Sequence, residues 1–137
     1  MKTYRDLQVW QKSMTLVTEI YKISKGFPKD EAYGLTSQMR RSAISIPSNM
    51  AEGYGRNSTN EYIHFLRIAT GSLYELQTQM EISMNLQYLD RGEFDKLYEL
   101  SREIERMLSS LIRKLSSKPV CVPVCPVGTA DRQRTGI

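Results

Sequence analysis

The sequence contains few of the residues from which catalytic and metal sites are built. Its 137 residues include one histidine and two cysteines. Cys121 and Cys125 are separated by three residues near the C-terminus, whereas a structural zinc site usually needs four Cys or His ligands. Glu61 and His64 have the Glu-x-x-His spacing of a ferritin-like di-metal site, but such a site needs this motif on two helices. We therefore expect no metal and no cofactor.

Long apolar runs and catalytic motifs are also absent. No run approaches the ~20 apolar residues that span a bilayer, and the N-terminus lacks the apolar stretch of a signal peptide. We therefore expect a cytoplasmic location and no contact with membranes. The Gly53-x-Gly55 pair is not preceded by the strand that a phosphate-binding loop requires. Without a recognisable nucleophile, base or metal, we expect a protein that is not an enzyme.

Apolar residues recur at helical spacing in four segments, and no segment alternates with the period of a strand. The predicted helices cover residues 6–25, 32–53, 58–86 and 90–116. Short connections between them predict an all-α, up-down-up-down antiparallel four-helix bundle over residues 1–116. Residues 117–137 contain three prolines and no such periodicity, and they are predicted to form a disordered tail.

Each predicted helix carries one apolar stripe, and together the four stripes are the predicted core. The first helix contributes Leu7, Trp10, Met14, Val17 and Tyr21. The second contributes Leu35, Met39, Ala43, Ile46 and Met50. The third contributes Tyr62, Phe65, Leu66, Ala69, Leu73, Leu76, Met80 and Met84. The fourth contributes Phe94, Leu97, Ile104, Leu108, Leu111 and Leu115.

Local signals mark the helix ends and two unusual positions. Ser58-x-x-Glu61 and Asp90-x-x-Glu93 predict capping boxes at the starts of the third and fourth helices. Pro47 lies inside the second helix, where it predicts a kink and leaves the Ala43 carbonyl without its usual donor. Ser45, Ser48 and Asn49 are the expected compensating donors, and the small residues Ala51 and Gly53 are expected to allow close helix packing. A polar site formed by Asn49 and Glu52 is the alternative interpretation.

Gly71 lies in the middle of the third predicted helix, where glycine costs about 1 kcal/mol relative to alanine. This cost predicts close approach by another helix, either within the bundle or from a neighbouring subunit.

Four segments occur in an order that resembles a known family. They are Tyr4-Arg5-Asp6-Leu7-x-Val9-Trp10, the run from Gly34 to Ala43, the run from Ile46 to Gly53, and Gly71-Ser72-Leu73-x-Glu75-Leu76. This series resembles the four-helix bundle proteins encoded within intervening sequences of bacterial 23S ribosomal RNA genes. The resemblance covers roughly residues 3 to 116 and implies a homopentamer. A related protein of diversity-generating retroelements, the accessory variability determinant, is a basic pentamer that binds nucleic acid and a reverse transcriptase.

Charge is distributed unevenly over the predicted bundle. Its topology places the N-terminus, the turn between the second and third helices, and the end of the fourth helix at one pole. The cations expected there are Lys2, Arg5, Arg56, Arg113, Lys114 and Lys118. With Asp6, Glu52 and Glu61 included, this pole has a net charge of +3, whereas the opposite pole is neutral. Arg40, Arg41 and Arg67 are expected at mid-height as secondary candidates for binding nucleic acid.

These observations predict a non-enzymatic oligomeric scaffold that binds nucleic acid, structured RNA in particular, through a basic face. The alternative is a module for protein–protein interaction in which the charges only maintain solubility. Exposed tyrosines also favour assembly, since a four-helix core cannot bury Tyr33, Tyr54, Tyr74, Tyr88 and Tyr98 together.

Overall fold

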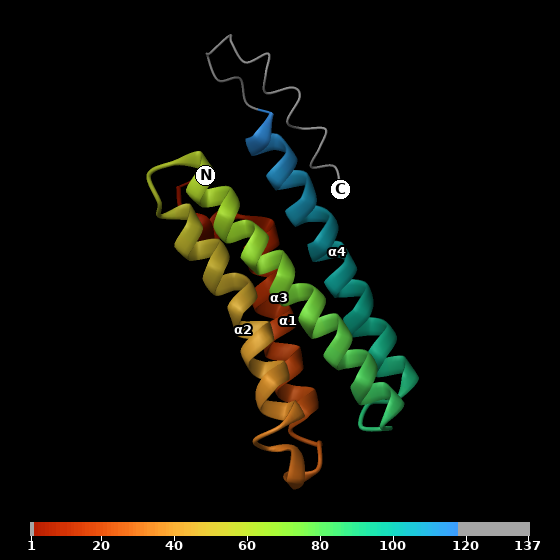
Figure 1. Cartoon of the computed structure of the whole chain (residues 1–137). Coiled ribbons are helices and arrows are strands. Elements are labelled where there is room, and N and C mark those ends of the chain that lie inside the picture. Colours follow the sequence, from red (N-terminus) through yellow and green to blue (C-terminus); the bar gives the residue numbers. More distant parts are fainter. Residues whose placement is uncertain (1, 118–137) are drawn as a thin grey trace, which may run out of the picture.

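The computed structural model describes residues 2–117, which fold into an all-α bundle of four helices (Figure 1). The helices are α1 (Gln8–Ser24), α2 (Leu35–Tyr54), α3 (Thr59–Asn85) and α4 (Arg91–Ser116). Two short 3-10 helices, η1 (Tyr4–Asp6) and η2 (Lys29–Glu31), precede α1 and α2. The predicted fold is therefore confirmed, with helix ends within a few residues of the predicted ones. The predicted tail lies outside the described residues apart from Ser117.

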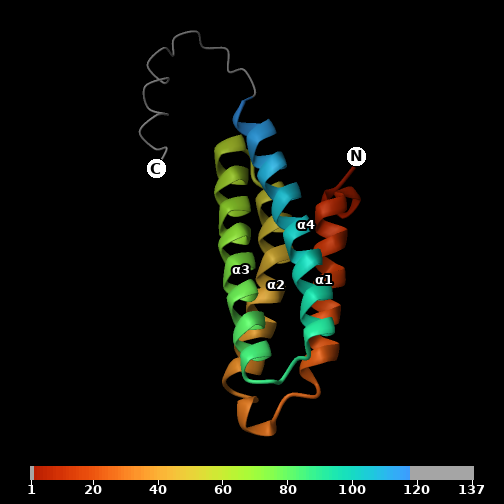
Figure 2. The ribbon, with the colours of Figure 1, turned by 90° about the vertical axis from the view of Figure 1, so that its right-hand side faces the viewer.

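Each helix runs antiparallel to the next one and packs against it, and α4 also packs against α1 (Figures 1 and 2). The N-terminal segment, the α2–α3 turn and the C-terminal end of α4 consequently lie at the same end of the bundle. We call this end the basic pole, because it holds Lys2, Arg5, Arg56, Arg113 and Lys114. None of the helices within residues 2–117 is long and apolar enough to cross a bilayer.

The core of α1 differs from the predicted one. The buried residues of this helix are Val9, Ser13, Leu16, Ile20 and Ser24. Met14 of the predicted stripe is 41% exposed, and Trp10, Val17 and Tyr21 are only partly buried. The predicted stripe therefore lies at the edge of the core, where Leu7, Trp10 and Val17 pack against it, and not at its centre. Helix α1 is apolar over two adjacent stripes, and the inner one contains serines. The stripes of α2 and α3 are largely confirmed, and that of α4 is buried as far as Leu108.

Serine takes the inner position at several helix crossings. Ser13 Oγ donates to the Val9 carbonyl at 2.8 Å, and Ser24 Oγ donates to the Ile20 carbonyl at 2.7 Å. Ser83 and Ser101 likewise donate to carbonyls within their own helices. A hydroxyl that bonds to the preceding turn is satisfied without a partner from another helix. These small residues can therefore be buried at low cost where helices approach closely.

Side chains and backbone geometry satisfy the helix ends. The Asp90–Glu93 capping box is complete, whereas at Ser58 the hydroxyl accepts from the Glu61 N–H and no reciprocal bond is present. The turn after α3 places Gln87 at a φ of 67°, in the left-handed region. The Tyr88 N–H donates to the Ser83 carbonyl and the Gln87 N–H donates to the Met84 carbonyl. These two bonds form a Schellman motif, which reverses the chain into α4.

The structure shows the surroundings of the two unusual positions, Pro47 in α2 and Gly71 in α3. Helix α2 continues through the buried Pro47, and the Asn49 amide donates to the Ser45 carbonyl at 2.8 Å rather than to Ala43. At Gly71, a Cβ atom would meet nothing within 4 Å, so close packing inside the bundle is not the reason for this glycine. The close packing expected at Gly53 is confirmed, since a Cβ atom there would lie 2.6 Å from Phe65 Cβ.

Candidate nucleic-acid interface

Several cations of the basic pole are engaged within the protein. Arg56 Nη2 lies 2.9 Å from Glu52 Oε2, and its guanidinium lies over the Phe65 ring, 4.8 Å from the centroid. Arg5 lies 5.6 Å from the centroid of the Trp10 ring. The Arg56–Glu52 ion pair reduces the local positive potential, although its exposed position makes it weak. Glu52, already counted in the expected net charge of this pole, therefore lies directly against Arg56 at the α2–α3 turn.

The secondary candidates Arg40 and Arg41 lie in different surroundings. Arg40 donates from Nε to Ser24 Oγ at 2.8 Å and from Nη2 to the Tyr21 carbonyl at 3.2 Å. Its guanidinium also lies 4.5 Å from the Tyr21 ring centroid, so this arginine caps the end of α1. Arg41 is exposed and lines a polar hollow between α2 and α3 that also contains Glu75. Neither arginine belongs to the basic pole.

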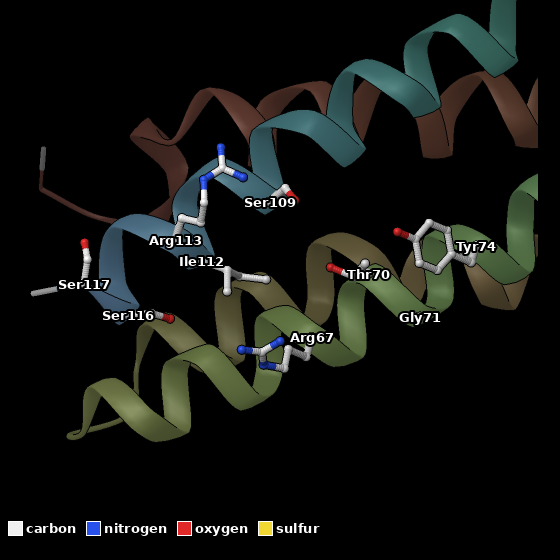
Figure 3. Close-up of a pocket in the computed structure, with 9 residues that line it drawn as sticks. All are labelled: Arg67, Thr70, Gly71, Tyr74, Ser109, Ile112, Arg113, Ser116 and Ser117. Atoms are coloured by element: carbon white, nitrogen blue, oxygen red, sulfur yellow. The ribbon is translucent and has the colours of Figure 1, made fainter. Parts of the chain in front are cut away.

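A groove of about 760 Å³ separates α3 from α4 near the basic pole, and we call it the α3/α4 groove (Figure 3). From α3 it is lined by Arg67, Thr70, Gly71 and Tyr74. From the last turns of α4 and the residue after it, it is lined by Ser109, Ile112, Arg113, Ser116 and Ser117. Ile112 lies between the two helices, Arg67 lies on the α3 wall, and Arg113 stands at the rim on α4 (Figure 3). The groove thus brings together Arg113, a cation expected at the basic pole, and Arg67, which was expected at mid-height.

Within residues 2–117, the charged side chains that line this groove are both arginines. Arg67 and Arg113 are both exposed, and no ion pair involves either of them within this range. No carboxylate is part of its lining in the described chain. Of the four Ser and Thr hydroxyls that complete it, those of Thr70 and Ser117 donate to the Leu66 and Lys114 carbonyls, so Ser109 and Ser116 are the hydroxyl donors for a phosphate. Arginine forks and hydroxyls are the groups that proteins use to bind phosphate oxygens. The lining therefore has the chemistry of a phosphate-binding surface.

Tyr74 lies at the inner end of the groove and is 50% exposed. Its hydroxyl donates to Glu105 Oε2 at 3.2 Å, while the other oxygen of Glu105 lies 3.1 Å from Arg102 Nε. Partial burial and this neighbouring carboxylate raise the pKa of the Tyr74 hydroxyl. The phenol is consequently neutral at physiological pH, and the nearby Glu105 charge is balanced by Arg102.

The remaining predicted residues are more dispersed. Lys114 lines a separate hollow on the other side of α4, together with Glu103 and Arg106. Lys118, Cys121 and Cys125 lie outside the described residues. Within residues 2–117, no three His, Cys, Asp or Glu side chains are grouped as metal ligands. The alternative polar site of Asn49 and Glu52 is not formed, since Asn49 bonds to Ser45 and Glu52 pairs with Arg56.

A second surface is apolar, and we call it the α1/α2 strip. It is a shallow hollow of about 300 Å³ whose lining includes Trp10, Met14 and Val17 from α1, and Ile44 and Pro47 from α2. Met14 is 41% exposed and Ile44 is 42% exposed. Trp10, Met14 and Val17 belong to the stripe that the sequence pattern assigned to the core. Three of the five tyrosines expected to be exposed are instead partly buried and pack against other aromatic rings, namely Tyr54, Tyr88 and Tyr98.

Sequence reasoning found the two arginines but not the groove. The positions of Thr70, Tyr74 and Ile112 relative to Arg67 and Arg113 depend on how far apart α3 and α4 lie at the basic pole (Figure 1). Leu111, Ile112 and Leu115 are only partly buried, so the core ends before α4 does. The available signal was Gly71, a helix-interior glycine that requires an explanation outside the core.

Comparisons with known proteins agree with this architecture. A solved structure from Bacteroides thetaiotaomicron VPI-5482, described as a protein with unknown function from the S23 ribosomal protein family, is 26% identical to this chain, with a TM-score of 0.69. The alignment covers 76% of this chain and 97% of that one. No curated protein matches this chain significantly. The family model for the 23S rRNA-intervening sequence protein matches residues 5–110. This chain therefore belongs to the 23S rRNA-intervening sequence protein family.

Proposed function

We propose that this protein is a non-enzymatic, oligomeric scaffold that binds structured RNA through the α3/α4 groove. The observation that carries this proposal is the charge of the groove. Arg67 and Arg113 line it from opposite helices, and no carboxylate of residues 2–117 contributes to its lining. Two other cations of the basic pole, Arg5 and Arg56, are partly occupied by Trp10 and Glu52.

The energetic basis of binding is the release of counterions from the phosphate backbone. Each phosphate that an arginine neutralises displaces condensed cations, so affinity falls as the salt concentration rises. Two unpaired arginines and several hydroxyls give few contacts in a single protomer. Repetition of the groove in an oligomer multiplies these contacts on one surface, because cyclic symmetry presents the same pole of each protomer on one face.

The α1/α2 strip supports the oligomeric part of the proposal. Its partly exposed residues, Trp10, Met14, Val17 and Ile44, are apolar and lie together across two helices. A contiguous apolar patch of this kind is typical of surfaces that contact another protein. A second copy of this chain is the proposed occupant, and the pentamer implied by the family resemblance is the expected assembly.

Charge removal tests the RNA-binding proposal. We expect Arg67→Gln/Arg113→Gln to weaken binding of a structured RNA, measured by fluorescence anisotropy over a series of salt concentrations. The slope of log K against log salt should decrease by about 0.7 to 0.9 for each phosphate that the variant no longer neutralises. Arg56 is left unchanged because it pairs with Glu52.

The matched control is Lys25→Gln/Lys29→Gln, which removes the same charge near the end of α1 and in η2. This variant should bind RNA nearly as the parent does. Equal weakening by both variants would show that only net charge matters and would contradict a site in the groove. Absence of binding by the parent would instead favour a protein-interaction module without RNA.

A further inference from the structure

Gly71 has no structural role within the bundle that explains its presence. It is exposed in the middle of α3, and a Cβ atom there would meet nothing within 4 Å. Glycine in a helix interior is unfavourable relative to alanine, and its usual benefit is that another group can approach the backbone. No group of the described chain makes that approach, so the space over Gly71 is open to a group of another molecule. Gly71 lies on the floor of the α3/α4 groove, one turn after Arg67 (Figure 3).

Tyr74 presents an aromatic surface beside this open position. Helical side chains lean over the preceding turn, so the Tyr74 ring lies towards Thr70 and Gly71 (Figure 3). The hydrogen bond from its hydroxyl to Glu105 Oε2, 3.2 Å long, holds the ring at its far end. Residues three apart are neighbours on a helix, yet a Cβ atom at position 71 would lie more than 4 Å from every atom of the Tyr74 ring. The glycine therefore leaves room for a flat group against Tyr74.

The groove thus combines an aromatic surface, an open backbone position and two arginines at its polar end. We infer that it binds an unpaired nucleotide of the RNA, whose base stacks on Tyr74 over Gly71 and whose phosphates contact Arg67 and Arg113. This inference rests on the proposed function and defines which part of the RNA is recognised. Unpaired bases in loops and bulges are free to stack on aromatic side chains, whereas bases within a duplex are not.

Two RNA probes of the same length test the inference: a hairpin with an unpaired loop and a fully paired blunt duplex. The parent should bind the hairpin more tightly than the duplex at equal salt. Tyr74→Leu should weaken hairpin binding roughly 5- to 150-fold, the usual effect of removing one stacked base. Tyr74→Phe retains the ring and loses only the hydrogen bond to Glu105, so it should weaken hairpin binding much less than Tyr74→Leu does.

Gly71→Ala gives a second test, with effects of opposite sign. The added methyl group meets no atom within 4 Å, so this variant should unfold at a higher urea concentration than the parent. It should nevertheless bind the hairpin more weakly, because the methyl group occupies space beside Tyr74. Gly92→Ala is the matched control, since Gly92 is an exposed helical glycine in the first turn of α4, outside the groove. That control should leave hairpin affinity unchanged.

The results separate this inference from the proposed function. Hairpin binding that persists in Tyr74→Leu and Gly71→Ala but is abolished in Arg67→Gln/Arg113→Gln would overturn base stacking and retain RNA binding. Equal affinity for duplex and hairpin would overturn the inference as well. Dissociation of the native oligomer by Gly71→Ala, detected by light scattering, would show that a second copy of the chain covers the groove, and it too would overturn the inference. Absence of any RNA binding by the parent would contradict both the inference and the proposed function.

Discussion

At the scale of single residues, two glycines differ in their surroundings. Gly71 in α3 faces open space, whereas Gly53 in α2 is packed tightly against α3. A Cβ atom at Gly53 would lie 2.6 Å from Phe65 Cβ and 3.2 Å from Tyr62 Cδ1. The Phe65 Cβ atom is attached directly to the backbone of α3, so it cannot move away without a shift of the helix. Overpacking usually costs about 1–3 kcal/mol. After the gain of about 1 kcal/mol in helix propensity is subtracted, Gly53→Ala should be less stable than the parent by up to about 2 kcal/mol.

Urea denaturation followed by circular dichroism at fixed protein concentration measures this effect. Gly55→Ala is the control, because a Cβ atom there would be 3.6 Å from its nearest neighbour and the residue has a φ of −81°. Gly55→Ala should leave stability nearly unchanged. A Gly53→Ala protein as stable as the parent would show that α2 and α3 can separate at the turn without cost.

The sequence pattern predicted the residue-scale features that depend on near neighbours and missed those that depend on distant ones. The Asp90–Glu93 capping box could be predicted because both partners lie within one helical turn. Close helix packing at Gly53 was expected from the small size of this residue, but its partner Phe65 could not be predicted, because it belongs to the next helix. The buried serines were missed for the same reason, since Ser13 and Ser24 are polar by type and buried by position.

At the scale of helices, Arg40 connects α2 to the C-terminal end of α1. Its guanidinium donates to Ser24 Oγ and the Tyr21 carbonyl and lies over the Tyr21 ring. A cation at this position also interacts favourably with the helix dipole. Arg40→Gln should lower the free energy of unfolding by about 1–3 kcal/mol, since it removes charged hydrogen bonds. Arg40→Lys should retain part of the free energy of unfolding that Arg40→Gln loses, because lysine keeps the charge but lacks the planar guanidinium.

The same variants indicate whether Arg40 also contacts RNA. Hairpin affinity at a temperature well below unfolding should be close to that of the parent in Arg40→Gln, because the side chain is occupied by α1. A decrease in affinity as large as that of Arg67→Gln, with unchanged stability, would contradict the capping role. Arg41→Gln is the comparison variant, because Arg41 is exposed and lies one residue from Arg40.

Helix α1 shows the limit of hydrophobic periodicity as a predictor of the core. Two adjacent stripes of this helix have helical spacing, and the more apolar one contains Trp10, Met14 and Val17. The pattern selected that stripe, whereas the structure buries the one with Leu16 and Ile20. A helix that contacts both its own bundle and another surface has an apolar face wider than the core requires. The misassigned residues are consequently the ones that form the α1/α2 strip.

At the scale of the whole molecule, topology made the basic pole predictable, and side-chain pairing altered it. The up-down order places the N-terminus, the α2–α3 turn and the end of α4 together, as expected (Figures 1 and 2). The count of charges did not reveal that Arg56 pairs with Glu52, or that Arg67 lines the same groove as Arg113. Those contacts depend on rotamers and on the separation of α3 and α4, which helical spacing does not determine.

The last prediction concerns assembly through the α1/α2 strip. Ile44 is 42% exposed in the protomer, beside Met14 and Pro47. If a second copy covers this strip, Ile44→Glu places a carboxylate in an apolar contact, where its desolvation is unfavourable. Ile44→Glu should therefore reduce the native mass, measured by light scattering at micromolar concentration, from that of an oligomer to that of a single chain. Its helical circular dichroism should remain close to that of the parent.

Ile82→Glu is the matched control for this experiment. Ile82 is 43% exposed on α3 and lies outside the strip, so the same substitution there should leave the native mass unchanged. A monomeric parent would rule out the oligomer, and an intact Ile44→Glu oligomer would place its interface elsewhere. Dissociation also predicts a change in RNA binding, because several linked grooves bind a long RNA more tightly than one groove does. The Ile44→Glu monomer should accordingly bind a long structured RNA more weakly while its affinity for a short hairpin, which fills one groove, stays the same.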